Sequence, residues 1–168
     1  MKSLSIRPLR TDEWELLREL RIRALTDAPY AFAQTIGEIQ DEPEMYWQQL
    51  AKNLRLSHHE FFIAFLNEEP IGITYGHLEA ADRHVAQVGS IWVSPMARGK
   101  GIGKQLLHRA MSWATAQGAQ RIKLWVTTDN SPAMKLYKSS GFVPTGKTDL
   151  LPSYPSLHVI EMARELDP

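Results

Sequence analysis

Hydrophobic and polar positions follow two periods along this chain, and the change from one period to the other predicts the order of its elements. Apolar residues that alternate with polar ones, or that run unbroken between turn residues, predict strands at 4–10, 60–66, 70–80, 84–93, 120–128, 142–150 and 156–166. Apolar residues at helical spacing predict helices at about 11–26, 42–54, 101–117 and 131–140. The predicted order is β-α-α-β-β-β-α-β-α-β-β.

Residues at the expected helix ends agree with these assignments. Thr11 or Asp12 is suited to cap the first helix, because short polar side chains accept hydrogen bonds from free backbone N–H groups. Ser131 is suited to cap the last helix for the same reason. Gly118 and Gly141 follow the last two helices, where a left-handed residue commonly ends a helix.

The connections between strands predict the kind of sheet. The strands at 84–93 and 120–128 are joined through a helix, so they are expected to run parallel by a right-handed crossover. The strands before them are joined by short turns and are expected to be antiparallel. A chain of 168 residues, 43% of them hydrophobic, can bury a sizeable core. We therefore expect one α/β domain over 1–168 with a mixed sheet.

Composition excludes several classes of protein. The chain has no cysteine, which excludes disulfides, thiolate metal sites and a cysteine nucleophile. Histidines show no spacing such as H-x-x-x-H, so no metal site is expected, and basic residues without interleaved aromatic ones do not indicate nucleic acid. No apolar run is long enough for a membrane span and the N-terminus does not resemble a signal peptide, so the expected compartment is the cytoplasm.

The net charge is zero, but the two signs are separated along the chain. Residues 1–82 hold 14 acidic against 8 basic residues, whereas residues 83–168 hold 5 acidic against 11 basic residues. This division is consistent with a basic half that holds an anionic ligand and an acidic half that attracts a cation. An asymmetry without function is the alternative.

The stretch VSPMARGKGIGKQLL at 93–107 places three alternating glycines among basic residues at the start of a predicted helix. Glycines at 99, 101 and 103 would let an anion approach the free N–H groups of the helix N-terminus without meeting a Cβ atom. Two phosphate-binding patterns do not fit. The P-loop requires a hydroxyl residue where Gln105 follows Lys104, and the dinucleotide fingerprint has a different glycine spacing.

The pattern that fits is R-x-x-G-x-G, formed by Arg98, Gly101 and Gly103, which resembles the acyl-CoA loop of the GNAT superfamily of N-acetyltransferases. The stretch NSPAMKLYKSSGF at 130–142 resembles the second block of that family, and the predicted element order matches its fold. The resemblance implies a mixed, mostly antiparallel sheet of about seven strands. It further implies one splayed parallel pair, with helices on both faces.

The ligand implied by this resemblance is acetyl-CoA. Its pyrophosphate would bind to the loop and helix start formed by Arg98, Gly99, Lys100, Gly101, Ile102, Gly103 and Lys104. The pantetheine arm would pair with the strand edge formed by Ile91, Trp92 and Val93, with the Ile91 N–H on the thioester carbonyl. Asn130 would hydrogen-bond the arm. Lys138 is a candidate for the 3′-phosphate, with a solvated surface lysine as the alternative.

The resemblance assigns the chemistry to Tyr137, whose hydroxyl would protonate the departing thiolate. The general base stays open. Histone-modifying members of the family have a glutamate at the position that aligns with Gln87, which cannot titrate. Glu79, His77 and Ser90 are the remaining candidates, and a chain of waters would also serve.

The acceptor is expected to be a cationic amine that binds between loops at 27–42 and 149–156. Four acidic residues of the first loop and its flank would attract it, namely Glu38, Asp41, Glu42 and Glu44. Two other functions remain open: acetylation of a protein N-terminus, as in ribosomal-protein alanine acetyltransferases, and a non-catalytic CoA-binding regulatory module. No membrane or nucleic-acid partner is expected, and a homodimer is left open.

Overall fold

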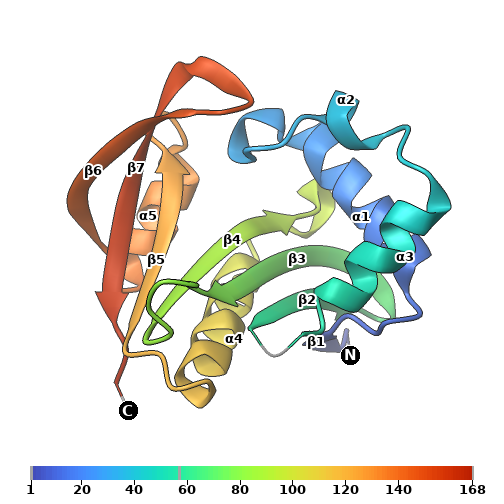
Figure 1. The fold of residues 1–168 in the computed structure, drawn as a ribbon, viewed down its shortest axis with the longest axis horizontal. Coiled ribbons are helices and arrows are strands. Elements are labelled where there is room, and N and C mark those ends of the chain that lie inside the picture. The colour runs from blue at the N-terminus through green and yellow to red at the C-terminus, as the bar shows by residue number, and fades with distance from the viewer. Residues whose placement is uncertain (1, 57, 168) are drawn as a thin grey trace.

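The computed structural model describes residues 2–56 and 58–167, which form one twisted seven-stranded sheet (Figure 1). The strand order across the sheet is β1-β2-β3-β4-β5-β7-β6. The strands are β1 (Leu4–Pro8), β2 (His59–Leu66), β3 (Glu69–Leu78), β4 (Val85–Val93), β5 (Arg121–Thr127), β6 (Val143–Leu151) and β7 (Tyr154–Glu165). All neighbouring pairs are antiparallel except β4 and β5, as the sequence predicts.

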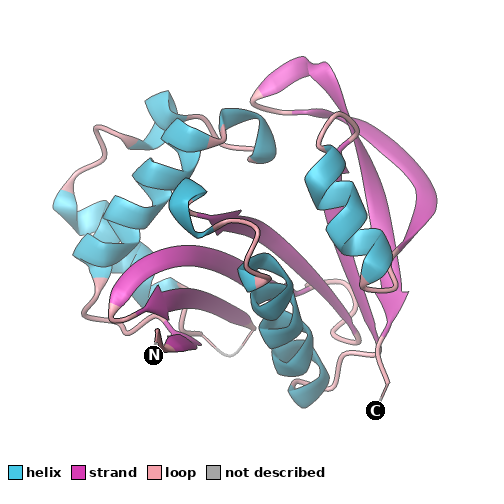
Figure 2. Cartoon of the chain, turned by 180° about the vertical axis from the view of Figure 1, so that it is seen from behind, coloured by secondary structure: helices cyan, strands magenta, loops and turns pink. Residues whose placement is uncertain are grey.

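Helices cover both faces of the sheet, which confirms the expected architecture (Figure 2). One face packs against α1 (Trp14–Asp27), α2 (Ile36–Ile39) and α3 (Glu44–Asn53), and the other against α4 (Ile102–Ala116) and α5 (Ser131–Ser139). Short 3-10 helices precede α2 and α4, at Pro29–Ala31 and Pro95–Ala97. Among the described residues, no helix has the length and apolar character that crossing a membrane requires.

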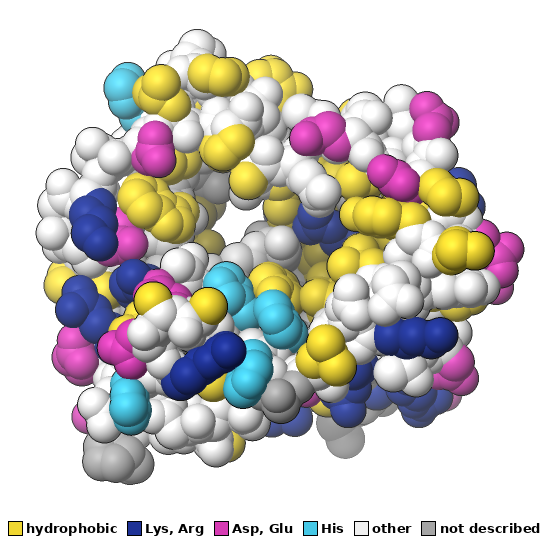
Figure 3. Space-filling view, in the orientation of Figure 1, with side chains coloured by type: hydrophobic (Ala, Val, Ile, Leu, Met, Phe, Trp, Pro, Cys, Tyr) yellow, Lys and Arg dark blue, Asp and Glu magenta, His cyan; other side chains and the backbone are white. Residues whose placement is uncertain are grey.

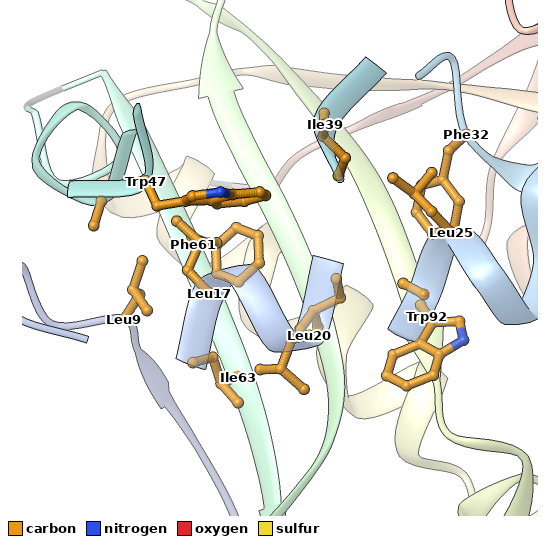
Figure 4. Packing of buried hydrophobic residues seen from close by; sticks show 13 residues of the cluster. Leu9, Leu17, Leu20, Leu25, Phe32, Ile39, Trp47, Phe61, Ile63 and Trp92 are labelled. Carbon is orange, nitrogen blue, oxygen red and sulfur yellow. The ribbon is translucent and has the colours of Figure 1, made fainter. Parts of the chain in front are cut away.

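Each face has its own hydrophobic core. Leu17, Leu20, Ala24 and Leu25 of α1 are buried, as their helical spacing predicts. They pack with Trp47 of α3 and with apolar residues of β2 to β4 (Figure 4). The second core lies between β5, α4 and α5. Burying such side chains is the main favourable term in folding, at about 1.5–3 kcal/mol for each large residue.

The parallel pairing of β4 with β5 is short. It extends only from Val85 to Gln87 on β4 and from Arg121 to Lys123 on β5, and beyond it the two strands diverge (Figure 1). The edge of β4 from Val88 to Val93 therefore has no strand partner on the β5 side. This is the splayed pair that the family resemblance predicts.

A β-bulge redirects β4 at the start of this splayed region. Between the pairs Ile73–Trp92 and Tyr75–Gly89, one residue of β3 faces two of β4, Ser90 and Ile91. Ser90 has a φ of 54°, which is left-handed backbone and uncommon for a residue other than glycine. Bulges bend a strand and re-aim its side chains. Here the bulge turns the β4 edge toward the space between the splayed strands.

Several local expectations are wrong. The first helix has Glu13, not Thr11 or Asp12, as its N-cap residue, and the Glu13 carboxylate binds Arg7. Asn130, not Ser131, caps α5. These caps fall one or two residues from the expected places, because which residue leaves the helical conformation depends on packing.

The two expected loops also contain regular structure. Segment 27–42 includes a 3-10 helix and α2, which a capping box between Thr35 and Glu38 begins. Segment 149–156 is the tip of a β-hairpin, with β6 ending at Leu151 and β7 starting at Tyr154. Cross-strand pairing extends to Leu151 and Tyr154, so Pro152 lies in the two-residue turn and β7 continues past Pro155.

Candidate functional site

The glycine loop before α4 has the backbone geometry of an anion site. Gly99 and Gly101 both have a φ of +75°, a conformation that L side chains rarely adopt. A Cβ atom at either position would meet no other atom within 4 Å. Within the described chain, the N–H groups of residues 99–104 bond to no backbone acceptor, and the first one that does belongs to Gln105. The loop therefore presents free donors at the positive end of the α4 dipole.

Gly103 serves a different purpose from the first two glycines. Its φ is not left-handed, and a Cβ atom there would lie 3.5 Å from Leu136 of α5 and 3.9 Å from Val93 of β4. Gly103 thus lies where α4, α5 and β4 converge at the wall of a groove.

This groove has a volume of about 550 Å³ and lies between the start of α4 and α5. Most predicted ligand residues line it, namely Ile91, Trp92, Val93, Arg98, Gly99, Gly101, Ile102, Gly103, Lys104, Asn130 and Tyr137. Lys100 and Lys138 are exposed and do not line it. Figure 2 shows α4 and α5 side by side on this face, with the splayed strands behind them.

Arg98 holds the loop in place. Its guanidinium donates to the Val93 carbonyl oxygen at 3.0 Å and pairs with the carboxylate of Asp27, the last residue of α1. The same carboxylate accepts a hydrogen bond of 2.8 Å from the indole of Trp92, which is buried. Asp27 therefore joins α1, the end of β4 and the glycine loop. Lys100 donates to the Met96 carbonyl oxygen at 3.3 Å.

A second cavity, of about 370 Å³, lies on the α1–α3 side of the splayed strands. Ile91, Asn130 and Tyr137 line both this cavity and the groove, together with Ala31 and Ala133. The two spaces therefore meet at the side chain of Tyr137. Figure 3 shows an opening through the molecule in this region, below the place where the β6–β7 hairpin meets the segment after α1.

Tyr137 is 9% exposed and packs with Phe142 at a ring-centroid distance of 6.1 Å. Burial raises the pKa of its hydroxyl to about 12, because the charged phenolate is disfavoured away from water. The hydroxyl is therefore protonated at neutral pH and can act as a proton donor. Nearby, the Asn130 side chain accepts a hydrogen bond of 3.2 Å from the Ala133 N–H, so Asn130 both caps α5 and lines the junction.

Of the candidate bases, Glu79 is bound elsewhere. Its carboxylate lies 2.5 Å from the Lys123 ammonium and accepts a hydrogen bond of 2.9 Å from Gln87. Burial acts to raise the pKa of Glu79, but the hydrogen bonds from Lys123 and Gln87 hold it below its ordinary value. Glu79 does not line the cavity, whereas Gln87 does. The Lys123 ammonium also lies 3.7 Å from the Glu161 carboxylate. These three charged groups lie where β4 and β5 begin to diverge.

Ser90 and His77 do line the cavity. The Ser90 hydroxyl accepts a hydrogen bond of 3.2 Å from Arg21. His77 forms part of an aromatic stack with Tyr75 and His59, with ring centroids 5.4–5.9 Å apart. Burial, followed by the charge of His59, lowers the pKa of His77 against an opposing contribution from Glu79. His77 is therefore a neutral imidazole at neutral pH, and its buried Nδ1 has no partner among the described residues.

Sequence reasoning missed several residues that line the second cavity, including Phe32, Tyr75 and Trp125. Tyr75 and His77 could have been paired in advance, because residues two apart on a strand share a face. Trp125 carried a weaker signal. It is a large apolar residue on a strand that alternates with buried Leu124 and Val126, and it is 39% exposed.

Contacts across the splay close one side of the second cavity. The Ser153 hydroxyl at the hairpin tip donates to the Phe32 carbonyl oxygen, and the Thr127 hydroxyl donates to that of Tyr30 at 2.9 Å. Tyr30 and Tyr154 pack edge to face at 4.4 Å. The segment after α1 and the hairpin therefore form a continuous roof, although the two are far apart in sequence.

Comparison with known proteins identifies the family and the fold. Residues 14–142 match the Acetyltransferase (GNAT) family. An uncharacterized N-acetyltransferase of Methanocaldococcus jannaschii is 34% identical over 88 residues, which are 49% of this chain and 38% of that protein. This chain thus spans well under half the length of that curated relative.

Two solved structures share the fold over nearly the whole chain. The GNAT-family acetyltransferase of Streptococcus pneumoniae has a TM-score of 0.79 at 22% identity and covers 98% of this chain and 100% of its own. The yncA protein of Salmonella typhimurium, solved with its cofactor acetyl-CoA, has a TM-score of 0.78 at 18% identity, with coverages of 99% and 95%. Given the family match across 129 residues, from 14 to 142, the chain belongs to the acetyltransferase (GNAT) family.

Proposed function

We propose that this protein transfers the acetyl group of acetyl-CoA to a primary amine by direct attack on the thioester. The observation that carries the proposal is the meeting of the groove and the second cavity at Tyr137. A cofactor in the groove and an acceptor in the cavity would bring their reacting atoms to one place. Such proximity can supply a large part of a rate enhancement.

The groove suits acetyl-CoA in charge and shape. The free N–H groups of residues 99–104 and the α4 dipole would hold the pyrophosphate. The open edge of β4 from Ile91 to Val93 would pair with the amides of the pantetheine arm as an added strand. The acetyl-CoA in the yncA structure supports this choice of cofactor. Because Arg98 is paired with Asp27, we assign it chiefly to shaping the loop.

In the transfer step, the amine nitrogen bonds to the thioester carbon and the carbon–sulfur bond breaks. Tyr137 gives its hydroxyl proton to the departing thiolate and regains one from the nitrogen as the amide forms. The Ile91 N–H would donate to the thioester oxygen as negative charge develops on it. No acyl-enzyme is needed, in agreement with the lack of cysteine.

An amine must lose its ammonium proton before it attacks, and we assign the removal of this proton to His77. Among the candidates, His77 combines a place in the cavity wall with an imidazole that is neutral, and so able to accept a proton, at neutral pH. The Glu79 carboxylate forms an ion pair with Lys123. Among the described residues, the Ser90 hydroxyl is hydrogen-bonded by Arg21, a cation that cannot take its proton.

The test is release of free thiol from acetyl-CoA with a panel of amines. Since the protein has no cysteine, a thiol reagent reports only the CoA product. Amine-dependent thiol release, with the acetylated amine found by mass spectrometry, is the expected result. Tight binding of acetyl-CoA without turnover on any amine would favour the regulatory module, and turnover confined to peptide N-termini would favour N-terminal acetylation. Location in the cytoplasm and assembly as a homodimer stay predictions. Light scattering would test the second by measuring the mass of the protein in solution.

A further inference from the structure

We infer that the acceptor is a small amine with a single ammonium group and an aromatic or aliphatic body that fills the second cavity. This inference rests on the proposed function and narrows it to a substrate class. It differs from an acceptor that is recognised through many positive charges.

The walls of the cavity are the first ground for this inference. Phe32, Tyr75 and Trp125 contribute aromatic surface, and the hairpin adds a group of apolar side chains at Leu150, Leu151, Pro152 and Val159. Trp125 is 39% exposed although it lies on a central strand between buried neighbours. A large exposed aromatic side chain within a concave site is typical of a surface that a ligand covers.

The distribution of charge is the second ground. Asp149 is the one carboxylate among the described residues that line the cavity, and it lies exposed on β6 with an oxygen accepting the Leu150 N–H. The four acidic residues Glu38, Asp41, Glu42 and Glu44 do not line it. A second ammonium group held deeper in the cavity, away from this exposed carboxylate, would therefore lose its hydration without gaining a partner.

Arg21 makes the inner end of the cavity still less suited to a second cation. Its guanidinium lies behind two lining residues, donating to Ser90 Oγ at 3.2 Å and stacking 5.5 Å from the Phe32 ring centroid. The guanidinium also donates to the Gln34 side chain at 2.8 Å, and no described carboxylate faces it. Burial lowers the pKa of Arg21, as expected for a cation without a counter-ion.

The size of the cavity is the third ground. Its volume of about 370 Å³ is at the lower end of the range of about 300–1,000 Å³ that small-molecule sites occupy. The roof formed by the Ser153–Phe32 and Tyr30–Tyr154 contacts closes the side between the helices and the hairpin. An apolar enclosure also assists the reaction, because loss of hydration favours the neutral amine over the ammonium.

Two amines of matched length separate the alternatives. Hexylamine and 1,5-diaminopentane have chains of the same length, but the first ends in a methyl group and the second in a second ammonium group. A third amine, 2-phenylethylamine, has an aromatic body. We expect kcat/KM for hexylamine and 2-phenylethylamine to exceed that for the diamine by about tenfold or more, since one misplaced charge outweighs a few apolar contacts. Equal or better use of the diamine would overturn the inference.

A variant series locates the effect in this cavity. Trp125→Ala should lower kcat/KM for 2-phenylethylamine by about tenfold, Trp125→Phe should keep most of it, and acetyl-CoA affinity should stay unchanged in both. Met45→Ala, at a position that is 76% exposed on α3 and lies outside the cavity, is the matched control. A Trp125→Ala protein that is folded and fully active on this amine would contradict the assignment.

Measurements of binding test the ligand class separately from catalysis. Calorimetry of 2-phenylethylamine and 1,5-diaminopentane with the CoA-bound protein reports the preference without turnover. If no amine releases thiol but the aromatic amine binds and the diamine does not, the proposed function fails while the ligand class stands. If neither binds, the ligand class fails.

Discussion

His77 on β3 is the register partner of Gln87 on β4, and both side chains line the second cavity. A neutral imidazole therefore lies directly across the strand pair from the glutamine. The proposed base, His77, therefore lies one strand away from Gln87.

Replacing His77 by Gln should lower kcat by about 10²–10⁴-fold if the imidazole takes the amine proton. Because burial lowers the pKa of His77, its neutral form is kept above pH 6.5 and is lost as pH falls through the lowered pKa. The wild type should thus lose kcat/KM only at pH values below 6.5, and the ratio of wild type to variant should fall there toward one.

His158→Gln on β7, outside the cavity, is the control for this prediction and should keep the wild-type profile. His59 and Tyr75 stack on His77, and Glu79 acts on its pKa. Substitution of any of these residues would therefore shift the acidic limb of the pH profile slightly. An unchanged acidic limb in His77→Gln would show that water carries the proton.

Tyr137→Phe should reduce kcat by about 10²-fold or more and leave the dissociation constant of acetyl-CoA within about twofold. The ring still fills the core beside Phe142, so the melting temperature should change little. With a pKa of about 12, Tyr137 should add no alkaline limb to the neutral-pH profile. Single-turnover kinetics and calorimetry measure the two quantities, and full turnover in the variant would make Tyr137 structural.

Gly101→Ala and Gly103→Ala form a matched pair that tests the loop. The first places a side chain at a φ of +75° and should cost about 1 kcal/mol, whereas the second lies in α4 with ordinary contacts and should be neutral or slightly stabilising. Thermal unfolding with and without acetyl-CoA checks both. Ligand at about 100 times its dissociation constant should add about 2.7 kcal/mol to the wild type and less to Gly101→Ala. Ligand shifts in both variants equal to that of the wild type would show that the loop is not part of the binding site.

Asp27→Asn should raise KM for acetyl-CoA by about fivefold while leaving KM for the amine unchanged. The carboxylate joins Arg98 to Trp92, and a partly exposed charge pair of this kind contributes about 1 kcal/mol to the order of the loop. Asp41→Asn, an exposed substitution outside both spaces, is the control. Initial-rate kinetics with each substrate varied in turn would show an effect on the amine instead if Asp27 served the acceptor.

Neutralising Glu38, Asp41, Glu42 and Glu44 together should change kcat/KM for a monoamine by less than about threefold, and added salt should remove even that change. None of the four lines the cavity, and exposed charges are screened within about 8–10 Å at physiological ionic strength. Stopped assays at two salt concentrations measure it. A large, salt-sensitive loss of kcat/KM would show instead that these four acidic residues attract the acceptor.

The sequence by itself determined the order of the strands and of the longer helices. Hydrophobic spacing is a local property, so the buried stripe of α1, formed by Leu17, Leu20, Ala24 and Leu25, could be predicted from the sequence. Glycine has the same locality. Gly99 and Gly101 are needed because their own φ angles are left-handed, whatever packs against them.

The proposed acceptor site and the proposed base depend on the tertiary structure. Phe32, Tyr75 and Trp125 come from three elements that are distant in sequence, and the splay of β4 from β5 after Gln87 is what brings them around one cavity. The roof likewise depends on a hairpin tip that reaches the segment after α1. The pKa of His77 and that of Tyr137 follow from burial, which no single stretch of sequence contains, because desolvation is the sum of everything that surrounds a group.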